Sequence, residues 1–349
     1  MLNDFSIIEG EYLQDILSQP QALDDTVQAL LPTKSLQKLA SRLNHGKFQR
    51  VVLTGMGSSF HALHPLNLEL IRLGHTAIMV ETSELVHYKS AFFDSTTLVV
   101  AVSQSGRSAE MLRLIKVNHG HAPLIAVTNT PDSPLAQTAD ALVLTRAGKE
   151  FSVSCKTYVT ALMALQWLAT VLANGDLDRV RKPLSRASSA AANYLAEWKE
   201  YVRSLAEDWR DIRHLFLVGR GASLAAAGTG ALIVKESDHF HAEGMSSAAF
   251  RHGPLEMLSQ EIFVLVFSGD KKTKALNRRL LDDVQKQGGR TELLGEEASY
   301  APFRIPAEGL ELRPLLEILP VQMVTLAIAA QMGREPGRFE LASKVTTTE

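Results

Sequence analysis

Residues 51–59, VVLTGMGSS, hold the pattern that decides the fold. The first three form an apolar run typical of a buried strand, and a helical spacing of apolar residues extends from Ser58 to Leu73. Residues 215–223, LFLVGRGAS, repeat this pattern 164 positions later, counted from Gly55 to Gly219 (219 − 55). Each copy consists of a strand, a Gly-x-Gly turn, a small residue, a serine and a helix. The repeat predicts two related α/β domains joined at about residues 175–185.

Further apolar runs alternate with helical segments in both halves. They predict strands over residues 77–80, 98–102, 124–127 and 141–144, with helices over 108–117 and 158–172. A charged helical region at about 178–207 precedes the second half, where strands are expected at 215–218, 262–267 and 291–294. Continuous apolar runs separated by helices are typical of a parallel sheet buried on both faces. The predicted fold class is therefore α/β, with two tandem domains that are each a doubly wound parallel sheet flanked by helices.

These segments divide the chain into four expected parts. N-terminal helices occupy residues 1–47, where apolar residues recur at helical spacing. The first domain covers 48–178, the second covers 179–333, and a C-terminal tail covers 334–349.

The composition excludes several classes of protein. Of 349 residues, 46% are hydrophobic and 21% are charged, so the chain can bury a sizeable core. The formal net charge of −2 and the lack of a basic cluster argue against a nucleic-acid partner. The lone Cys155 excludes an intrachain disulfide and a zinc site built from cysteines.

We expect a cytoplasmic protein with no membrane partner. The first residues lack the basic and apolar regions of a signal peptide. The most apolar late stretch, Pro314 to Met332, is interrupted by Glu317, Pro320 and Gln322, which favours a buried helix over a membrane span.

The first Gly-x-Gly turn is a candidate phosphate site. Such a turn between strand and helix directs backbone N–H groups toward a ligand. Phe60 and Leu224 stand where a dinucleotide-binding motif would have its third glycine, so a dinucleotide is weakly supported. Ser58 and Ser59 add hydroxyl donors, which suit a phosphate monoester. A tight turn with a serine cap is the competing interpretation.

A second loop, residues 103–108, strengthens the case for a phosphate. Ser103, Gln104, Ser105 and Ser108 follow a predicted strand and precede a helix. They offer more hydrogen-bond donors than a helix cap requires, which favours phosphate binding. Two such loops at neighbouring strand ends would line one crevice.

The third constellation combines a carboxylate with an imidazole. Glu236 ends the helix that follows the second Gly-x-Gly turn, and His252 precedes Gly-Pro. Together they could move protons on a carbon next to a carbonyl. A metal site built from His239, His241, Glu243 and His252 is a weaker alternative, because the spacing is irregular. A histidine that merely packs in the core or lies on the surface is the other alternative.

The chain resembles the double-domain branch of the SIS (sugar isomerase) family. That branch includes the isomerase half of glucosamine-6-phosphate synthase, the amino-sugar-phosphate deaminase/isomerases and the glycated-amino-acid 6-phosphate deglycases. The motifs that carry the resemblance are GMGSS at 55–59, SQSG at 103–106, TRAGKE at 145–150, HAE at 241–243, HGPL at 252–255 and KVT at 344–346.

The resemblance implies a role for each candidate residue. The substrate phosphate would be bound by Ser58, Ser59, Ser103, Gln104, Ser105 and Ser108. Glu236 would be the general base between C1 and C2, and His252 would assist ring opening and reach a neighbouring subunit's site. Lys344 would belong to a tail that closes over the sugar, and could form a Schiff base with an open-chain ketose.

The chain departs from the synthase at four positions. Leu2 stands where the synthase has its glutaminase cysteine, so we expect no glutaminase activity. Ile233 replaces a helix lysine, with Lys235 placed next to Glu236 instead. Arg107 replaces an acidic residue directly after the SQSG motif.

The expected function is that of a sugar-phosphate isomerase-type enzyme. Its substrate would be an amine-bearing hexose 6-phosphate, and its reaction that of a deaminase/isomerase or a deglycase. We expect a homodimer or larger assembly with shared active sites, and neither cofactor nor metal. The alternative is a non-catalytic sugar-phosphate-binding regulator, and a nucleotide-dependent enzyme is a third possibility.

Overall fold

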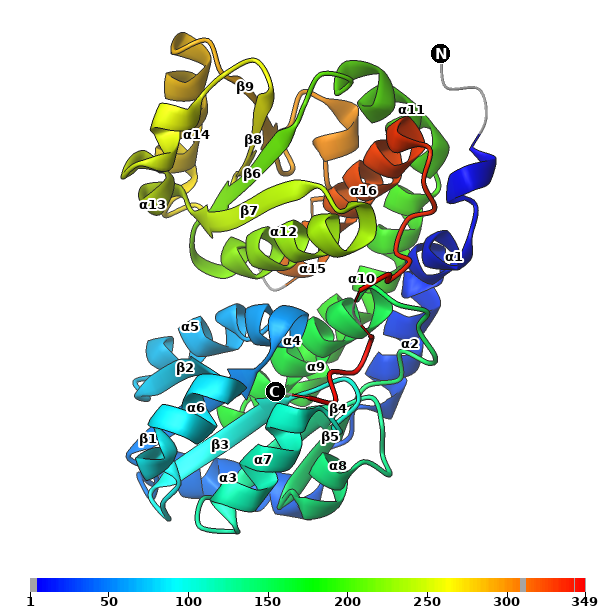
Figure 1. The fold of residues 1–349 in the computed structure, drawn as a ribbon. Coiled ribbons are helices and arrows are strands. Elements are labelled where there is room, and N and C mark those ends of the chain that lie inside the picture. Colours follow the sequence, from blue (N-terminus) through cyan, green and yellow to red (C-terminus); the bar gives the residue numbers. More distant parts are fainter. Residues whose placement is uncertain (1–4, 308–311, 342, 349) are drawn as a thin grey trace. The chain divides into compact units, whose positions relative to one another are not determined.

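The computed structural model describes residues 5–307, 312–341 and 343–348, and within them it contains two parallel sheets (Figure 1). The first sheet has the strand order β2-β1-β3-β4-β5 and the second has the order β7-β6-β8-β9. The strands of the first are β1 (Arg50–Gly55), β2 (Ala77–Glu81), β3 (Thr97–Val102), β4 (Leu124–Thr128) and β5 (Ala141–Leu144). Those of the second are β6 (His214–Gly219), β7 (His241–Ser246), β8 (Ile262–Phe267) and β9 (Arg290–Leu294). All the strands expected from apolar runs are confirmed.

The chain forms two compact units with one sheet each. Unit 1 comprises Met1–Pro20, Phe151–Cys155 and Ala187–Leu341, and unit 2 comprises Gln21–Glu150, Lys156–Arg186 and Ala342–Glu349. The helices of unit 1 are α1 (Glu11–Leu17), α11 (Trp198–Asp208), α12 (Leu224–Asp238), α13 (Ser247–Arg251), α14 (Lys274–Lys286), α15 (Arg313–Leu316) and α16 (Ile318–Met332). Those of unit 2 are α3 (Lys34–Asn44), α4 (Gly57–His61), α5 (His64–Arg72), α6 (Thr82–Tyr88), α7 (Ala109–Asn118), α8 (Pro134–Thr138) and α9 (Lys156–Leu172). Two of the bounds between units fall inside helices, namely α2 (Gln19–Ala29) and α10 (Leu177–Leu195).

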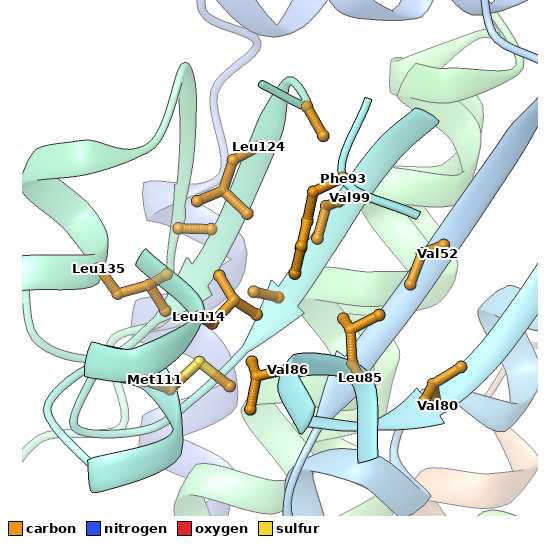
Figure 2. Close-up of a cluster of buried hydrophobic side chains, with 13 residues drawn as sticks. Val52, Val80, Leu85, Val86, Phe93, Val99, Met111, Leu114, Leu124 and Leu135 are labelled. Carbon is orange, nitrogen blue, oxygen red and sulfur yellow. The ribbon is translucent and has the colours of Figure 1, made fainter. Parts of the chain in front are cut away.

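Helices cover both faces of the sheet in unit 2. On one face, Val52 and Val99 from the strands pack with Leu85 from α6 and with Met111 and Leu114 from α7 (Figure 2). On the other face, α9 contacts β4 and β5, and α3 and α5 pack against α9. The predicted doubly wound arrangement is confirmed, because strands buried on both sides are what the continuous apolar runs require.

The sheet of unit 1 is covered in the same way. Phe216 and Val264 pack with Phe250 of α13 and Leu280 of α14 on one face. On the other face, α12 contacts β6, β7 and α16. The stretch Arg313–Met332 is apolar enough to cross a membrane, but 89% of its most apolar window is buried within the structure. It is therefore a core helix, as the interrupting polar residues predicted.

Two local features differ from expectation. The helix expected from Ser58 to Leu73 is interrupted, because α4 ends at His61 and α5 begins at His64. The strand β7 was not expected, since its sequence HAEGMS lacks an apolar run. It lies at the edge of its sheet, where Gly244 packs so closely that an added Cβ would lie 2.3 Å from the carbonyl oxygen of Ala227. Backbone pairing and this close approach form the strand in place of apolar side chains.

Candidate functional site

The first Gly-x-Gly turn leads from β1 into α4. Gly57 has a φ of +52°, and a Cβ on Gly55 would lie 3.0 Å from backbone atoms of Ser59 and Phe60. Both positions therefore require glycine. Ser58 and Ser59 are half-buried, and neither hydroxyl forms a hydrogen bond with another residue that the structure describes. Their donors are available to a ligand.

The serine loop, defined here as residues 103–108, joins β3 to α7. The Oγ of Ser103 accepts from the N–H of Gly106 at 3.1 Å, and the Oγ of Ser105 accepts from that of Arg107 at 3.2 Å. Ser108 caps α7 by accepting from the N–H of Met111 at 3.4 Å. Each of these hydrogen bonds uses an oxygen lone pair and leaves the hydroxyl hydrogen to donate elsewhere. The loop is held in place while its donors stay available.

Tight packing fixes the shape of the serine loop. Gly106 has a φ of +58°, and a Cβ there would lie 2.3 Å from the Oγ of Ser133. The exposed Arg107 forms an ion pair at 3.2 Å with Asp132, which lies in the segment between β4 and α8.

The two loops lie at one edge of the sheet. β1 and β3 are neighbours, with Thr54 paired to Ala101, and the turn and the serine loop follow their carboxyl ends. The strand order reverses between these two strands, which is where open α/β sheets bind ligands. The structure thus brings Ser58 and Ser59 to the same edge as Ser103, Gln104, Ser105 and Ser108.

The C-terminal tail contacts the start of the helix that follows the serine loop, within unit 2. The carbonyl of Thr346 accepts from the N–H of Ala109, the first residue of α7, at 3.0 Å. The Nζ of Lys344 lies 2.9 Å from Oε2 of Glu150 and 3.1 Å from its carbonyl oxygen. Lys344 is therefore anchored near the predicted phosphate loop.

Glu150, the partner of Lys344, is a residue to which the sequence assigned no role. Its side chain is fully buried, and it accepts from the N–H and the hydroxyl of Thr157 at 2.9 and 2.6 Å. A buried carboxylate with these donors and an ammonium partner is a strongly held ion pair. The only available signal was its place in the segment TRAGKE, because its partner Lys344 is 194 residues away.

Glu236 occupies the last turn of α12 in unit 1 and is half-buried. Two hydrogen bonds fix this end of the helix, since the N–H of Gly337 donates to the carbonyl of Ser237 at 3.3 Å and Arg334 donates to that of Asp238 at 3.4 Å. Burial raises the pKa of the Asp238 carboxyl well above its usual value, against the opposing effects of Ser237 and Arg334. The proposed base therefore lies on a helix end that is held firmly.

Two of the residues that depart from the synthase pattern, Ile233 and Lys235, lie on different sides of α12. Ile233 is fully buried among apolar side chains, and Lys235 is exposed. Lys235 therefore does not occupy the place on the helix where the synthase has its lysine and this chain has Ile233.

His252 directly follows α13, whose last residue is Arg251, and it is exposed. Gly253 follows it with a φ of +139°, and the short 3-10 helix Pro254–Met257 comes next. The proposed site residues are thus distributed as Glu236 and His252 in unit 1, and the serines with Gln104 and Lys344 in unit 2.

The histidines near Glu236 do not gather into a metal site. His241 and Glu243 lie on the edge strand β7 with 3.7 Å between Nε2 and Oε1, and His239 lies 3.3 Å from Arg334. Over residues 5–307, 312–341 and 343–348, no group of three or more histidine, cysteine or acidic side chains could hold a metal ion.

The second Gly-x-Gly turn differs from the first in its chemistry. Gly221 has a φ of +59°, close to that of Gly57, but Ser223 is buried and its Oγ donates to Oε1 of Glu317 at 2.8 Å. Burial raises the pKa of Glu317 to about 7, against smaller lowering effects of Ser223 and Arg313. Ser223, which corresponds to Ser59 in the repeat, therefore donates its hydroxyl hydrogen to the internal carboxyl group of Glu317.

Glu317→Gln is expected to remove a pH-dependent loss of stability. The folded chain favours the protonated carboxyl, so ionisation destabilises it increasingly from pH 4.5 to pH 7 and fully above pH 7. The shift from 4.5 to about 7 corresponds to about 3 kcal/mol. Denaturant unfolding of both proteins at pH 5 and pH 8 should show that the free energy of unfolding of the variant increases relative to that of the native chain as the pH rises. An equal change in both proteins would contradict the prediction.

The SIS domain model matches residues 47–171 and 209–295, which span both sheets of the structure. The glutamine–fructose-6-phosphate aminotransferase (isomerizing) of Pyrococcus horikoshii is 29% identical over 97% of this chain. This chain spans 57% of the length of that relative.

Solved structures show the same fold. The C-terminal domain of glucosamine-fructose-6-phosphate aminotransferase from Francisella tularensis has a TM-score of 0.84 at 22% identity, covering 95% of this chain and 98% of that one. The glucosamine-6-phosphate deaminase of Thermotoga maritima has a TM-score of 0.77 at 19% identity, covering 97% of this chain and 100% of that one. At these identities the likeness shows the fold alone.

Proposed function

Because this chain belongs to the SIS domain family, we propose that it is a sugar-phosphate isomerase-type enzyme acting on an amine-bearing hexose 6-phosphate. The observation that carries the proposal is the serine loop, whose hydroxyl oxygens accept local backbone N–H groups while their hydrogens stay available. Hydroxyls and amides in a fixed arrangement suit a single phosphate group. The loop also lies where parallel sheets bind ligands.

Phosphate binding is assigned to the residues at the carboxyl ends of β1 and β3. Ser58, Ser59, Ser105 and Ser108 would donate hydroxyl hydrogens to the phosphate oxygens, and Ser103 with Gln104 would complete the set. A hexose 6-phosphate bound in this way has its C1 and C2 at the far end of the sugar from the phosphate.

Proton transfer is assigned to Glu236, with ring opening assisted by His252. Glu236 would take a proton from the carbon next to the carbonyl or imine, giving an enediol-like or enamine intermediate, and return it to the neighbouring carbon. Water would then add to the resulting imine carbon, and the nitrogen would leave with a proton as an amine. The products are a sugar phosphate and ammonia or an amine, as in a deaminase/isomerase or a deglycase.

Lys344 is assigned to the substrate-closing tail. Its Nζ is paired with the buried carboxylate of Glu150 at 2.9 Å, which holds the side chain in place. A Schiff base with an open-chain ketose would require the loss of a proton from Nζ and release from Glu150. We therefore propose that Lys344 supplies positive charge near the sugar and forms a covalent bond only after this release.

We propose that the enzyme is cytoplasmic and works as a homodimer or larger assembly, with His252 supplied by a neighbouring subunit. The exposure of His252 on its own chain is consistent with that role. Mixing the inactive variants Glu236→Gln and His252→Ala should restore part of the turnover, because mixed dimers would contain one intact site. A mixture that stays inactive while mixed dimers form would contradict the shared site.

A panel of substrates tests the proposed function. Glucosamine 6-phosphate and the fructose- and glucose-amino-acid 6-phosphates would be incubated with the protein, and the products identified by mass spectrometry. Release of ammonia or an amine together with a sugar phosphate is expected. If the panel binds and nothing is turned over, the chain is a sugar-phosphate-binding regulator instead.

A further inference from the structure

Unit 2 contains a polar pocket of about 690 Å³ beside the serine loop. Asp25 and Gln28 of α2 form one wall, and Asn129, Thr145, Arg146 and Gly148 form the other. The second wall follows the carboxyl ends of β4 and β5, so the pocket opens at the same edge of the sheet as the serine loop.

Hydrogen bonds hold the wall made by residues 145–148 in one shape. The side chain of Asn129 accepts from the N–H of Ala147 at 2.9 Å and donates to the carbonyl of Gly148 at 2.9 Å. The N–H of Arg146 donates to the hydroxyl of the buried Thr26 at 3.0 Å. A binding wall that is already ordered loses little entropy when a ligand arrives.

The pocket is linked directly to the serine loop. The carbonyl of Gln104 accepts from the N–H of Asn129 at 3.2 Å and from the hydroxyl of Thr130 at 3.1 Å. Since β3 and β5 are two strands apart, their carboxyl ends lie roughly 10 Å from each other. An extended open-chain sugar phosphate with a substituent on its nitrogen is long enough to span that separation.

The pocket offers one charge of each sign. Arg146 and Asp25 are both exposed, and in the described part of the chain neither side chain forms an ion pair. The Asp25 carboxylate accepts one neutral hydrogen bond, from Gln21 at 2.8 Å. A guanidinium suits a carboxylate, and a carboxylate suits an ammonium group. An amino acid carries both of these partners.

We propose that this pocket binds the amino-acid part of a hexose 6-phosphate whose nitrogen carries an amino acid. Arg146 pairs with the carboxylate of that substituent and Asp25 with its ammonium nitrogen. The inference rests on the proposed function, because it takes the serine loop as the phosphate site. It favours a deglycase over an enzyme that acts on a simple amino sugar.

Calorimetric binding of three ligands tests the pocket independently of turnover. They are fructose 6-phosphate, 6-phosphofructosyl-ethylamine and 6-phosphofructosyl-glycine. The glycine adduct has a carboxylate where the ethylamine adduct has a methyl group. The native protein should bind the glycine adduct about tenfold more tightly than the ethylamine adduct, as one charged hydrogen-bonded pair provides. Arg146→Gln should abolish that difference. Asp25→Asn should weaken both adducts about tenfold, with fructose 6-phosphate unchanged.

The control is Arg113→Gln, which removes an exposed arginine of α7 in the same unit and should leave all three affinities unchanged. Equal binding of the two adducts by the native protein, no binding of the glycine adduct, or an equal loss for all ligands in Arg146→Gln would overturn the assignment. Turnover is measured separately. If the glycine adduct binds as expected and is not turned over, the assignment of the pocket is supported and the proposed chemistry is contradicted.

Discussion

Glu236→Gln is expected to lower turnover by about a thousandfold, within the range of 10² to 10⁴ that a general base contributes. The substitution keeps the shape of the side chain and removes its ability to accept a proton. Because the proposed phosphate site lies on other residues, affinity for a sugar phosphate should change by less than about twofold, well under the tenfold that a lost charged contact produces. The measurement is steady-state kinetics with the best substrate of the panel, together with calorimetric binding.

The matched control for this prediction is Glu261→Gln, which changes an exposed glutamate of unit 1 in the same way. It should keep native turnover and native affinity. Turnover by Glu236→Gln at the rate of this control would remove Glu236 as the base. A loss of sugar-phosphate binding would instead point to a role of Glu236 in binding.

Glu150→Leu is expected to destabilise the protein by about 3 kcal/mol. The variant leaves the N–H and the hydroxyl of Thr157 without their acceptor and leaves Lys344 without its counter-charge. The tail should also lose its anchor, so the amide of Ala109, which donates to Thr346, should exchange its hydrogen faster. Denaturant unfolding and hydrogen exchange measure the two effects.

Lys149→Met serves as the control for the buried pair, because the exposed Lys149 is the immediate neighbour of Glu150. Its effect should stay within about 0.5 kcal/mol, as for other surface substitutions. If Glu150→Leu behaves like this control, the Glu150–Lys344 pair does not hold the tail.

The sheets could be predicted because their signal is local. The run from Leu98 to Val102 is apolar throughout, and β3 there is buried on both faces. The strand β7 had no such run, since it lies at an edge and pairs through its backbone. The position of Ser103 and Ser105 at a strand end followed from the same local pattern. Their role in binding phosphate was predicted from the donors that the loop offers and from the family resemblance.

The pairings between residues far apart in the sequence could not be predicted. Ser223 and Glu317 are 94 residues apart, and Glu150 and Lys344 are 194 apart. Such contacts depend on how distant segments pack. The sequences of the two Gly-x-Gly turns do not reveal which serine hydroxyl forms a hydrogen bond with another residue of the chain. The pocket beside Asn129 was missed for the same reason, because Asp25 and Arg146 approach it from different segments.

Transfer of a hydrogen between C1 and C2 is the central claim of the proposed chemistry, and an isotope label tests it most directly. Glucosamine 6-phosphate carrying deuterium at C2 would be incubated with the native protein and examined by NMR, with the amino-acid adduct labelled at C1 examined in parallel. The account predicts that the label leaves its carbon, either to water or to the neighbouring carbon, and that Glu236→Gln prevents this. Recovery of both bound compounds with every label in its original position would contradict it.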